Sequence, residues 1–146
     1  MHSINGRTWV VRWMYAVAIV HLLVGFALPW IGNLPVFDSY HRTVENVFWT
    51  NGAPESARAQ QIWWISLFGP TIQGLSLWMW ALIYIGDRHC SRFAWGSLFI
   101  GIAVWAPQDM LISLRADAWI HVWIDCFASM TMLPPLLWLW WHDRTE

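Results

Sequence analysis

The chain has 146 residues, of which 58% are hydrophobic and only 12% are charged, and its mean hydropathy is +0.40. Soluble domains carry about 25% charged residues, so this composition excludes a disordered chain and an ordinary cytosolic fold. The formal net charge of -1 points to neither a strongly acidic nor a strongly basic partner, and no nucleic-acid binding is expected.

Four apolar stretches are long enough to cross a bilayer, whose hydrocarbon core of about 30 Å needs about 20 apolar residues per helix. They cover residues 8–30, 61–85, 93–114 and 118–141. Only helices and closed barrels satisfy their backbone groups in lipid, and these stretches lack the strict alternation of barrel strands. The sequence therefore predicts an all-α integral membrane protein, a single domain over residues 1–146 built as a four-helix transmembrane bundle.

The connection between the first two spans predicts a short amphipathic helix on the outer face of the membrane. Apolar side chains recur there at every fourth position: Val36, Tyr40, Val44 and Phe48. This spacing is typical of a helix with one apolar face, and Asp38 or Ser39 is the expected N-cap. The intervening Asp38, His41 and Glu45 are expected on the solvated face.

The arginines predict the orientation, because cytoplasmic loops are enriched in positive charge. If the four spans alternate, five arginines share one side: Arg7, Arg12, Arg88, Arg92 and Arg144. Three fall on the other side: Arg42, Arg58 and Arg115. We therefore expect both termini in the cytoplasm, in a bacterial inner membrane.

Most of the 15 tryptophans fall near the predicted membrane interfaces, where an apolar ring with a polar N–H group is favoured. Trp95 belongs to this belt, and Asp87 and Asp143 beside it are expected to be ordinary interface residues. Trp105 instead falls inside the third span, either facing lipid or forming the wall of a cavity.

Ionisable residues within a membrane helix are costly and indicate function by default. His121 and Asp125 are four residues apart, so they lie on one face of the last span. Asp109 follows Gln108 near the outer end of the third span. His21 lies in the outer half of the first span.

Gln73 adds a polar group from the second span, and alternating topology gives all these side chains similar depths. The sequence thus predicts one polar cavity in the outer half of the bundle. His121, Asp125 and Asp109 are the candidate catalytic residues. The candidate ligand-binding residues are His21, Gln73, Trp105 and Gln108.

Each member also has a structural interpretation. His121 and Asp125 could form a hydrogen bond that only stabilises the bundle. His21 could be a satisfied core histidine, and Gln73 could serve helix packing. Pro70 and Pro107 each remove a backbone donor and free a carbonyl near the cluster, but they could simply be tolerated kinks.

A histidine beside a carboxylate supports general acid–base chemistry. We therefore expect a protein that binds a hydrophobic or amphipathic small molecule, a membrane lipid or another lipid-soluble compound, with or without isomerase-like catalysis. One alternative is a non-catalytic accessory or assembly subunit of a membrane complex, with a membrane-protein partner or a second copy of the chain. Another is a haem- or metal-binding membrane protein, although no metal ligand is assigned and no cofactor is indicated.

Overall fold

The computed structural model describes the backbone of residues 3–143 and the side chains of residues 6–143. The predicted cytoplasmic Arg144 lies outside the described residues. The described chain is all-helical. Its five α-helices are α1 (Ser3–Ile31), α2 (Asp38–Phe48), α3 (Glu55–His89), α4 (Arg92–Arg115) and α5 (Trp119–His142), with a 3-10 turn at Pro35–Phe37 before α2.

Three helices of the described chain are long and apolar enough to cross a membrane: α1, α4 and α5. In their most apolar windows only 22%, 17% and 22% of residues are buried inside the protein, so the apolar side chains mostly face outward, as lipid contact requires. These helices indicate a membrane protein. A fourth span is not established in this way, because α3 carries Pro70, Gln73 and several tryptophans, which lower its hydropathy.

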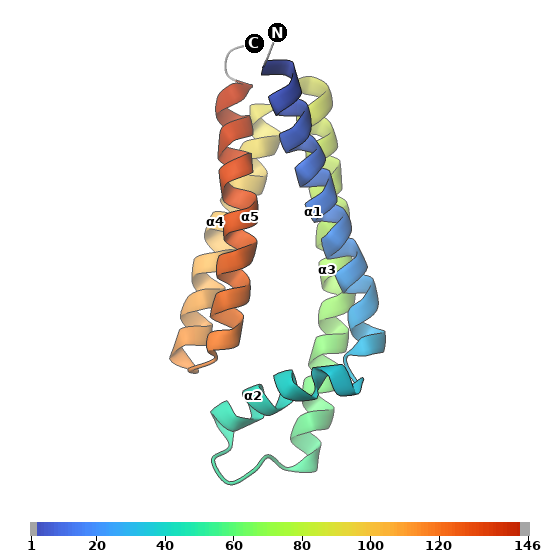
Figure 1. Ribbon diagram of the computed structural model, residues 1–146, viewed down its shortest axis with the longest axis vertical. Coiled ribbons are helices and arrows are strands. Elements are labelled where there is room, and N and C mark those ends of the chain that lie inside the picture. The colour runs from blue at the N-terminus through green and yellow to red at the C-terminus, as the bar shows by residue number, and fades with distance from the viewer. Residues whose placement is uncertain (1–2, 144–146) are drawn as a thin grey trace.

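The long helices pack as two antiparallel hairpins, α1 with α3 and α4 with α5 (Figure 1). The hairpins meet where α1 begins, α3 turns into α4 and α5 ends, and we call this the terminal end. They diverge toward the opposite end, which α2 crosses and which we call the α2 end (Figure 1). The molecule is therefore a wedge that is closed at one end and open at the other.

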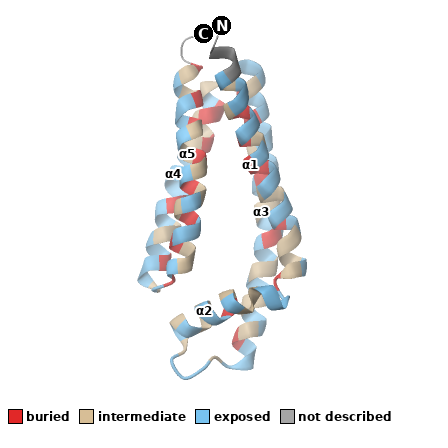
Figure 2. Ribbon diagram, in the orientation of Figure 1, coloured by how far each residue is buried: buried red, intermediate tan, exposed pale blue. Residues whose placement is uncertain are grey.

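Buried side chains run along the facing sides of the helices (Figure 2). The hydrophobic core joins the two hairpins only toward the terminal end, where Met14, Ile83, Trp95, Leu136 and Leu139 are fully buried. Trp95 is thus a core residue in the first turn of α4, which its position in the sequence alone does not indicate. Its ring packs on Gly86, where a Cβ atom would come within 2.5 Å of the indole.

A polar network also closes the terminal end. The Arg7 guanidinium donates to a carboxylate oxygen of Asp143 at 2.9 Å and to one of Asp87 at 3.0 Å. The Trp95 indole N–H donates to the other Asp143 oxygen at 2.7 Å. Asp87 and Asp143 are therefore not ordinary interface residues, because one arginine ties α1, α3, α4 and α5 together through them.

The α1–α3 hairpin is tightest where two glycines cross. A Cβ atom on Gly69 would lie 2.6 Å from the Gly25 carbonyl oxygen, and one on Gly25 would lie 2.8 Å from the Gly69 oxygen. Small residues allow such close backbone approach between membrane helices. Beside the crossing, the Gln73 side-chain amide donates to the Gly25 carbonyl at 3.1 Å.

Helix α2 lies where the sequence predicts it, but with another face turned inward. His41 is 1% exposed, and its Nε2–H donates to the Gly32 carbonyl at 2.8 Å. Asp38 and Glu45 accept from Arg58 of α3. The expected solvated face is wrong for His41, which is buried, and for Glu45, whose side chain is 14% exposed. Asp38 keeps a side chain that is 45% exposed. Asp38 is the first residue of the helix rather than its N-cap, which is Phe37.

Candidate functional site

The polar residues predicted for one cavity are divided between the two hairpins. His21 and Gln73 lie on the α1–α3 hairpin, and Asp109, His121 and Asp125 lie on the α4–α5 hairpin. The hairpins diverge from the terminal end toward the α2 end (Figure 1). The groove that contains Asp109 is lined by residues of α4 alone, without His21 or Gln73.

The two residues of the α1–α3 hairpin are bonded to that hairpin's own backbone. His21 is half-buried, and its Nδ1–H donates to the Val17 carbonyl of the same helix at 2.8 Å. Gln73 holds the Gly25 carbonyl at the helix crossing. Both contacts stabilise the hairpin, as the structural interpretation of these residues expects.

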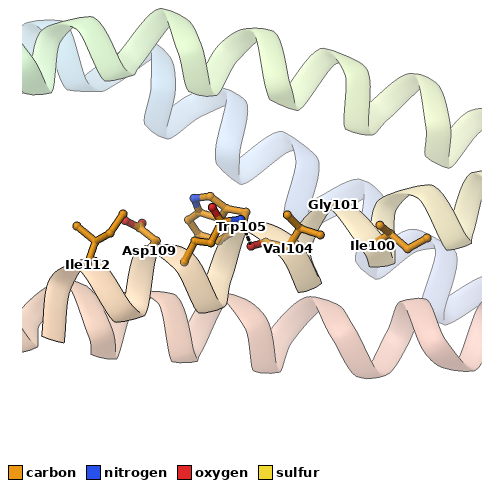
Figure 3. A pocket seen from close by; sticks show the side chains of 7 residues that line it. Ile100, Gly101, Val104, Trp105, Asp109 and Ile112 are labelled. Atoms are coloured by element: carbon orange, nitrogen blue, oxygen red, sulfur yellow. Dashed lines mark hydrogen bonds between the residues drawn. The ribbon is translucent and has the colours of Figure 1, made fainter. Parts of the chain in front are cut away.

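A groove of about 590 Å³ runs along the face of α4 that points away from α5 (Figure 3). Ile100, Gly101, Val104, Trp105, Gln108, Asp109 and Ile112 line it. Three residues predicted to contact a ligand or take part in catalysis, Trp105, Gln108 and Asp109, therefore share one surface. Trp105 forms the wall of this groove and is 46% exposed.

The groove is polar in one part and apolar in the rest. Toward the α2 end it presents Gln108 and Asp109, and toward the terminal end it presents Val104 and Ile100. The Gln108 amide donates to the Val104 carbonyl at 2.9 Å (Figure 3). Asp109 is half-buried and forms no ion pair with a described residue.

Asp125 lies on the face of α5 that packs against α4. Buried α5 residues recur there with alternating spacings of three and four: Val122, Asp125, Ser129, Met132, Leu136 and Leu139. Asp125 is only 4% exposed, and its Oδ2 atom has no hydrogen-bond partner. Asp109 is close enough to interact with it electrostatically. The α4–α5 hairpin thus carries two acidic side chains that influence each other, on helices apolar enough to cross a membrane.

His121 does not bond to Asp125 among the described residues. Its Nε2 atom instead shares a hydrogen bond of 3.1 Å with the Tyr40 hydroxyl of α2, and the two rings meet edge to face with centroids 5.7 Å apart. Burial raises the pKa of Tyr40, so this phenol stays protonated at neutral pH. The contact connects α2 with the far hairpin, across the open side of the wedge. Sequence spacing could not reveal this pair, because 81 positions separate the two residues.

An unpaired serine extends the carboxylate site toward the core. The Ser129 hydroxyl is buried without a hydrogen-bond partner, one helical turn from Asp125 on the same face. Other helical hydroxyls, such as those of Ser66 and Ser76, donate to the carbonyl four residues earlier at 2.8 and 2.6 Å. The sequence prediction of the site does not include Ser129, although its spacing of four residues from Asp125 places both on one helix face.

Comparisons with known proteins identify no relative: no protein-family model, no curated protein and no solved structure matches the chain. The functional argument therefore rests on the geometry of the groove and of the carboxylate pair.

Proposed function

We propose that the protein spans the membrane four times and binds an amphipathic, lipid-soluble small molecule in the groove along α4. The fourth span in this proposal is α3. Its 35 residues correspond to about 52 Å of helix, longer than a bilayer core. It pairs with α1 from the Gly25–Gly69 crossing to the Arg7–Asp87 contact at the terminal end. A partner of that length beside a spanning helix supports a spanning role.

The arrangement of the chain ends supports cytoplasmic termini in this proposal. Arg7 and Arg12 lie near the start of α1, and Arg88 and Arg92 flank the α3–α4 turn, all at the terminal end. The positive-inside rule assigns that end to the cytoplasm. We place the protein in a bacterial inner membrane, so that α2 lies on the outer face.

A single observation carries the proposed binding function. The groove on α4 is lined mostly by apolar side chains, and Asp109, with Gln108 beside it, lies between Trp105 and Ile112 (Figure 3). Asp109 is also close enough to interact electrostatically with Asp125 of α5. The volume of the groove is within the range of about 300–1,000 Å³ of small-molecule sites. An apolar groove with one polar section suits a molecule that has a hydrocarbon body and a polar group.

In this proposal Asp109 and Asp125 bind the polar group of the ligand, and Trp105 and Gln108 lie beside its hydrocarbon part. Helix α2 connects the two hairpins through the hydrogen bond between Tyr40 and His121. The geometry favours binding over acid–base catalysis, because the His121 imidazole bonds to Tyr40 and not to either carboxylate. His21 and Gln73 contribute to the stability of the opposite hairpin.

Native mass spectrometry of the gently solubilised protein tests the binding function. Gly101 lines the groove, and a Cβ atom there would meet nothing within 4 Å, so Gly101→Leu fills the groove without a backbone clash. Gly74 on α3 is equally open and outside the groove, which makes Gly74→Leu the matched control. We expect a small-molecule adduct on the wild type and on Gly74→Leu that is lost from Gly101→Leu.

A wild-type chain without any adduct, or an adduct that Gly101→Leu retains in full, would contradict the proposal. A bare chain that is stoichiometrically bound to another polypeptide would instead support an accessory subunit. A spectrum of two or more copies with no small molecule would support a homo-oligomer without ligand.

Cysteine labelling tests the fourth span. In a background in which Cys90 and Cys126 are replaced by serine, Arg42→Cys and His89→Cys each introduce one exposed thiol, on α2 before α3 and at the end of α3. We expect a membrane-impermeant maleimide applied from outside to label position 42 and not position 89, because α3 separates them. Labelling of both positions, or of position 89 alone, would contradict the proposed topology.

A further inference from the structure

Three pairs of carboxylates are found in the described part of the chain, and two of them are each bridged by one arginine. Arg7 bridges Asp87 and Asp143, and Arg58 bridges Asp38 and Glu45. In both cases the arginine comes from another helix and is partly shielded from solvent. The chain thus repeats one arrangement at its two ends, two acidic groups closed around one cation.

The third pair, Asp109 and Asp125, has no such cation. Among the described residues, neither carboxylate forms an ion pair, although they are close enough to repel each other. Asp125 is 4% exposed and its Oδ2 atom is unpartnered. A buried carboxylate without a counter-charge or hydrogen bond is costly, so a positively charged group beside Asp125 would stabilise its ionised form.

Ser129 completes the site with an uncharged oxygen. Ser129 is 9% exposed, and its hydroxyl has no hydrogen-bond partner. It therefore does not donate to the backbone carbonyl of residue 125 on its own helix. Asp109, Asp125 and Ser129 therefore offer oxygen atoms only. In the described chain no cluster of three or more histidine, cysteine or acidic side chains could hold a metal ion, so a transition-metal centre is not the occupant that this site suits.

We infer that the site formed by Asp109, Asp125 and Ser129 takes up a positively charged group, either the ammonium head of an amphipathic amine or an alkali cation. The inference rests on the proposed binding function and defines its ligand class. Carboxylate and hydroxyl oxygens accept hydrogen bonds from an ammonium group and also coordinate hard cations. Of the three residues, only Asp109 lines the apolar groove, while Asp125 and Ser129 are buried on α5. Val104 and Ile100 of the groove would accommodate the hydrocarbon chain of an amine whose head lies at Asp109.

The test compares matched probes on the full chain in nanodiscs of zwitterionic lipid. Hexadecylamine carries a cationic head at neutral pH, and hexadecanol has the same chain with a neutral head. Sodium chloride is compared with choline chloride at equal ionic strength. Binding is measured by the shift in thermal unfolding and by the fluorescence of the tryptophans, of which Trp105 lines the groove.

The inference predicts that hexadecylamine or sodium raises the unfolding temperature and that hexadecanol does not. Asp125→Asn should weaken binding of that cation by about 30-fold or more, the loss expected when one partner of a buried charge pair is removed. Asp117→Asn, at an exposed acid in the α4–α5 turn, should leave binding unchanged. An effect of hexadecylamine assigns the site to an amphipathic amine, and an effect of sodium alone assigns it to an alkali cation.

Two results would overturn the inference, and they differ in what they say of the proposed function. Equal stabilisation by hexadecanol and hexadecylamine would refute a cation site but preserve an amphipathic ligand. No effect of any probe, or a cation effect that Asp125→Asn retains, would refute the cation site. Absence of a copurified adduct in native mass spectrometry is the separate result that refutes the binding function itself.

Discussion

The terminal end and the α4–α5 hairpin use acidic residues in different ways. At the terminal end, Asp143 accepts hydrogen bonds from Arg7 and from the Trp95 indole, and four helices close around it. On the α4–α5 hairpin, Asp109 and Asp125 interact electrostatically, and neither forms an ion pair with a described residue. The difference teaches that an arginine from another helix turns acidic side chains of this fold into links between helices. The proposed cation site is the one acid pair for which no such arginine is found in the described part of the chain.

Removal of the arginine should break the closed end and have the largest effect. Arg7→Ala leaves the Asp143 carboxylate, whose side chain is 1% exposed, without its charged partner. We expect a loss of about 3–5 kcal/mol in the free energy of unfolding, the usual cost of removing one partner of a buried ion pair. Reversible unfolding in mixed micelles measures it. Arg12→Ala, at an exposed position on the same helix, is the control, and equal losses in both variants would contradict the account.

The glycine crossing offers the next largest effect, because it determines how close α1 and α3 lie. Gly69→Ala would place a Cβ atom 2.6 Å from the Gly25 oxygen, so we expect a loss of about 1–3 kcal/mol in unfolding free energy. Gly74→Ala, on the same helix with open space around it, should stabilise the helix by up to about 1 kcal/mol. The opposite signs are the prediction, and destabilisation by both variants would point to helix-wide effects instead.

The bond between α2 and the far hairpin is a weaker link that Tyr40→Phe removes. We expect a loss of about 0.5–1.5 kcal/mol, the net worth of one hydrogen bond, confined to the docking of α2. Hydrogen exchange of the α2 amides should become faster, while the exchange of amides at the terminal end stays unchanged. Tyr84→Phe, at an exposed tyrosine of α3, is the control. Unchanged exchange in α2 would show that Tyr40 does not hold it.

Acidification should give the smallest effect, again on α2. The hydrogen bond from Arg58 lowers the pKa of Glu45 below its ordinary value of about 4.3. The stabilisation from this pair is therefore complete above that ordinary value and is lost as the pH falls through the lowered pKa. Because the groups are partly solvated, we expect less than about 1 kcal/mol.

Limited proteolysis of the α2 region between pH 6 and pH 3 measures this change. Arg58→Gln should make α2 equally accessible at both pH values, whereas Arg42→Gln, at an exposed position, should keep the wild-type pH dependence. A pH dependence that survives Arg58→Gln would assign the effect to another acid.

The helices could be predicted from the sequence because their signals are local. The third and fourth predicted spans, 93–114 and 118–141, differ from α4 and α5 by one residue at each end. The second span, 61–85, is longer in the structure because α3 extends from Glu55 to His89, where polar residues continue the helix beyond its apolar stretch.

The site could be predicted only in part, because sequence gives depth but not direction around the bundle. Asp109 and Asp125 lie close enough to interact electrostatically, because a short turn joins α4 to α5 and fixes the register of the two helices. His21 and Gln73 share their depth but point into another hairpin. The partners of Arg7 lie 80 and 136 positions away, a separation over which residue spacing carries no information.

If Asp125 serves to bind a cation, its buried charge lowers the unfolding free energy of the protein without ligand. The unfolding free energy of Asp125→Asn in the absence of ligand tests this most directly. The amide keeps the shape of the side chain and removes the uncompensated charge beside Asp109. We predict that the unfolding free energy in mixed micelles rises by about 0.5–2 kcal/mol, as at other sites where function costs stability, while Asp117→Asn changes little. If Asp125→Asn instead lowers the unfolding free energy, the carboxylate already contributes to the stability of the bundle, and the account of an unfilled cation site is contradicted.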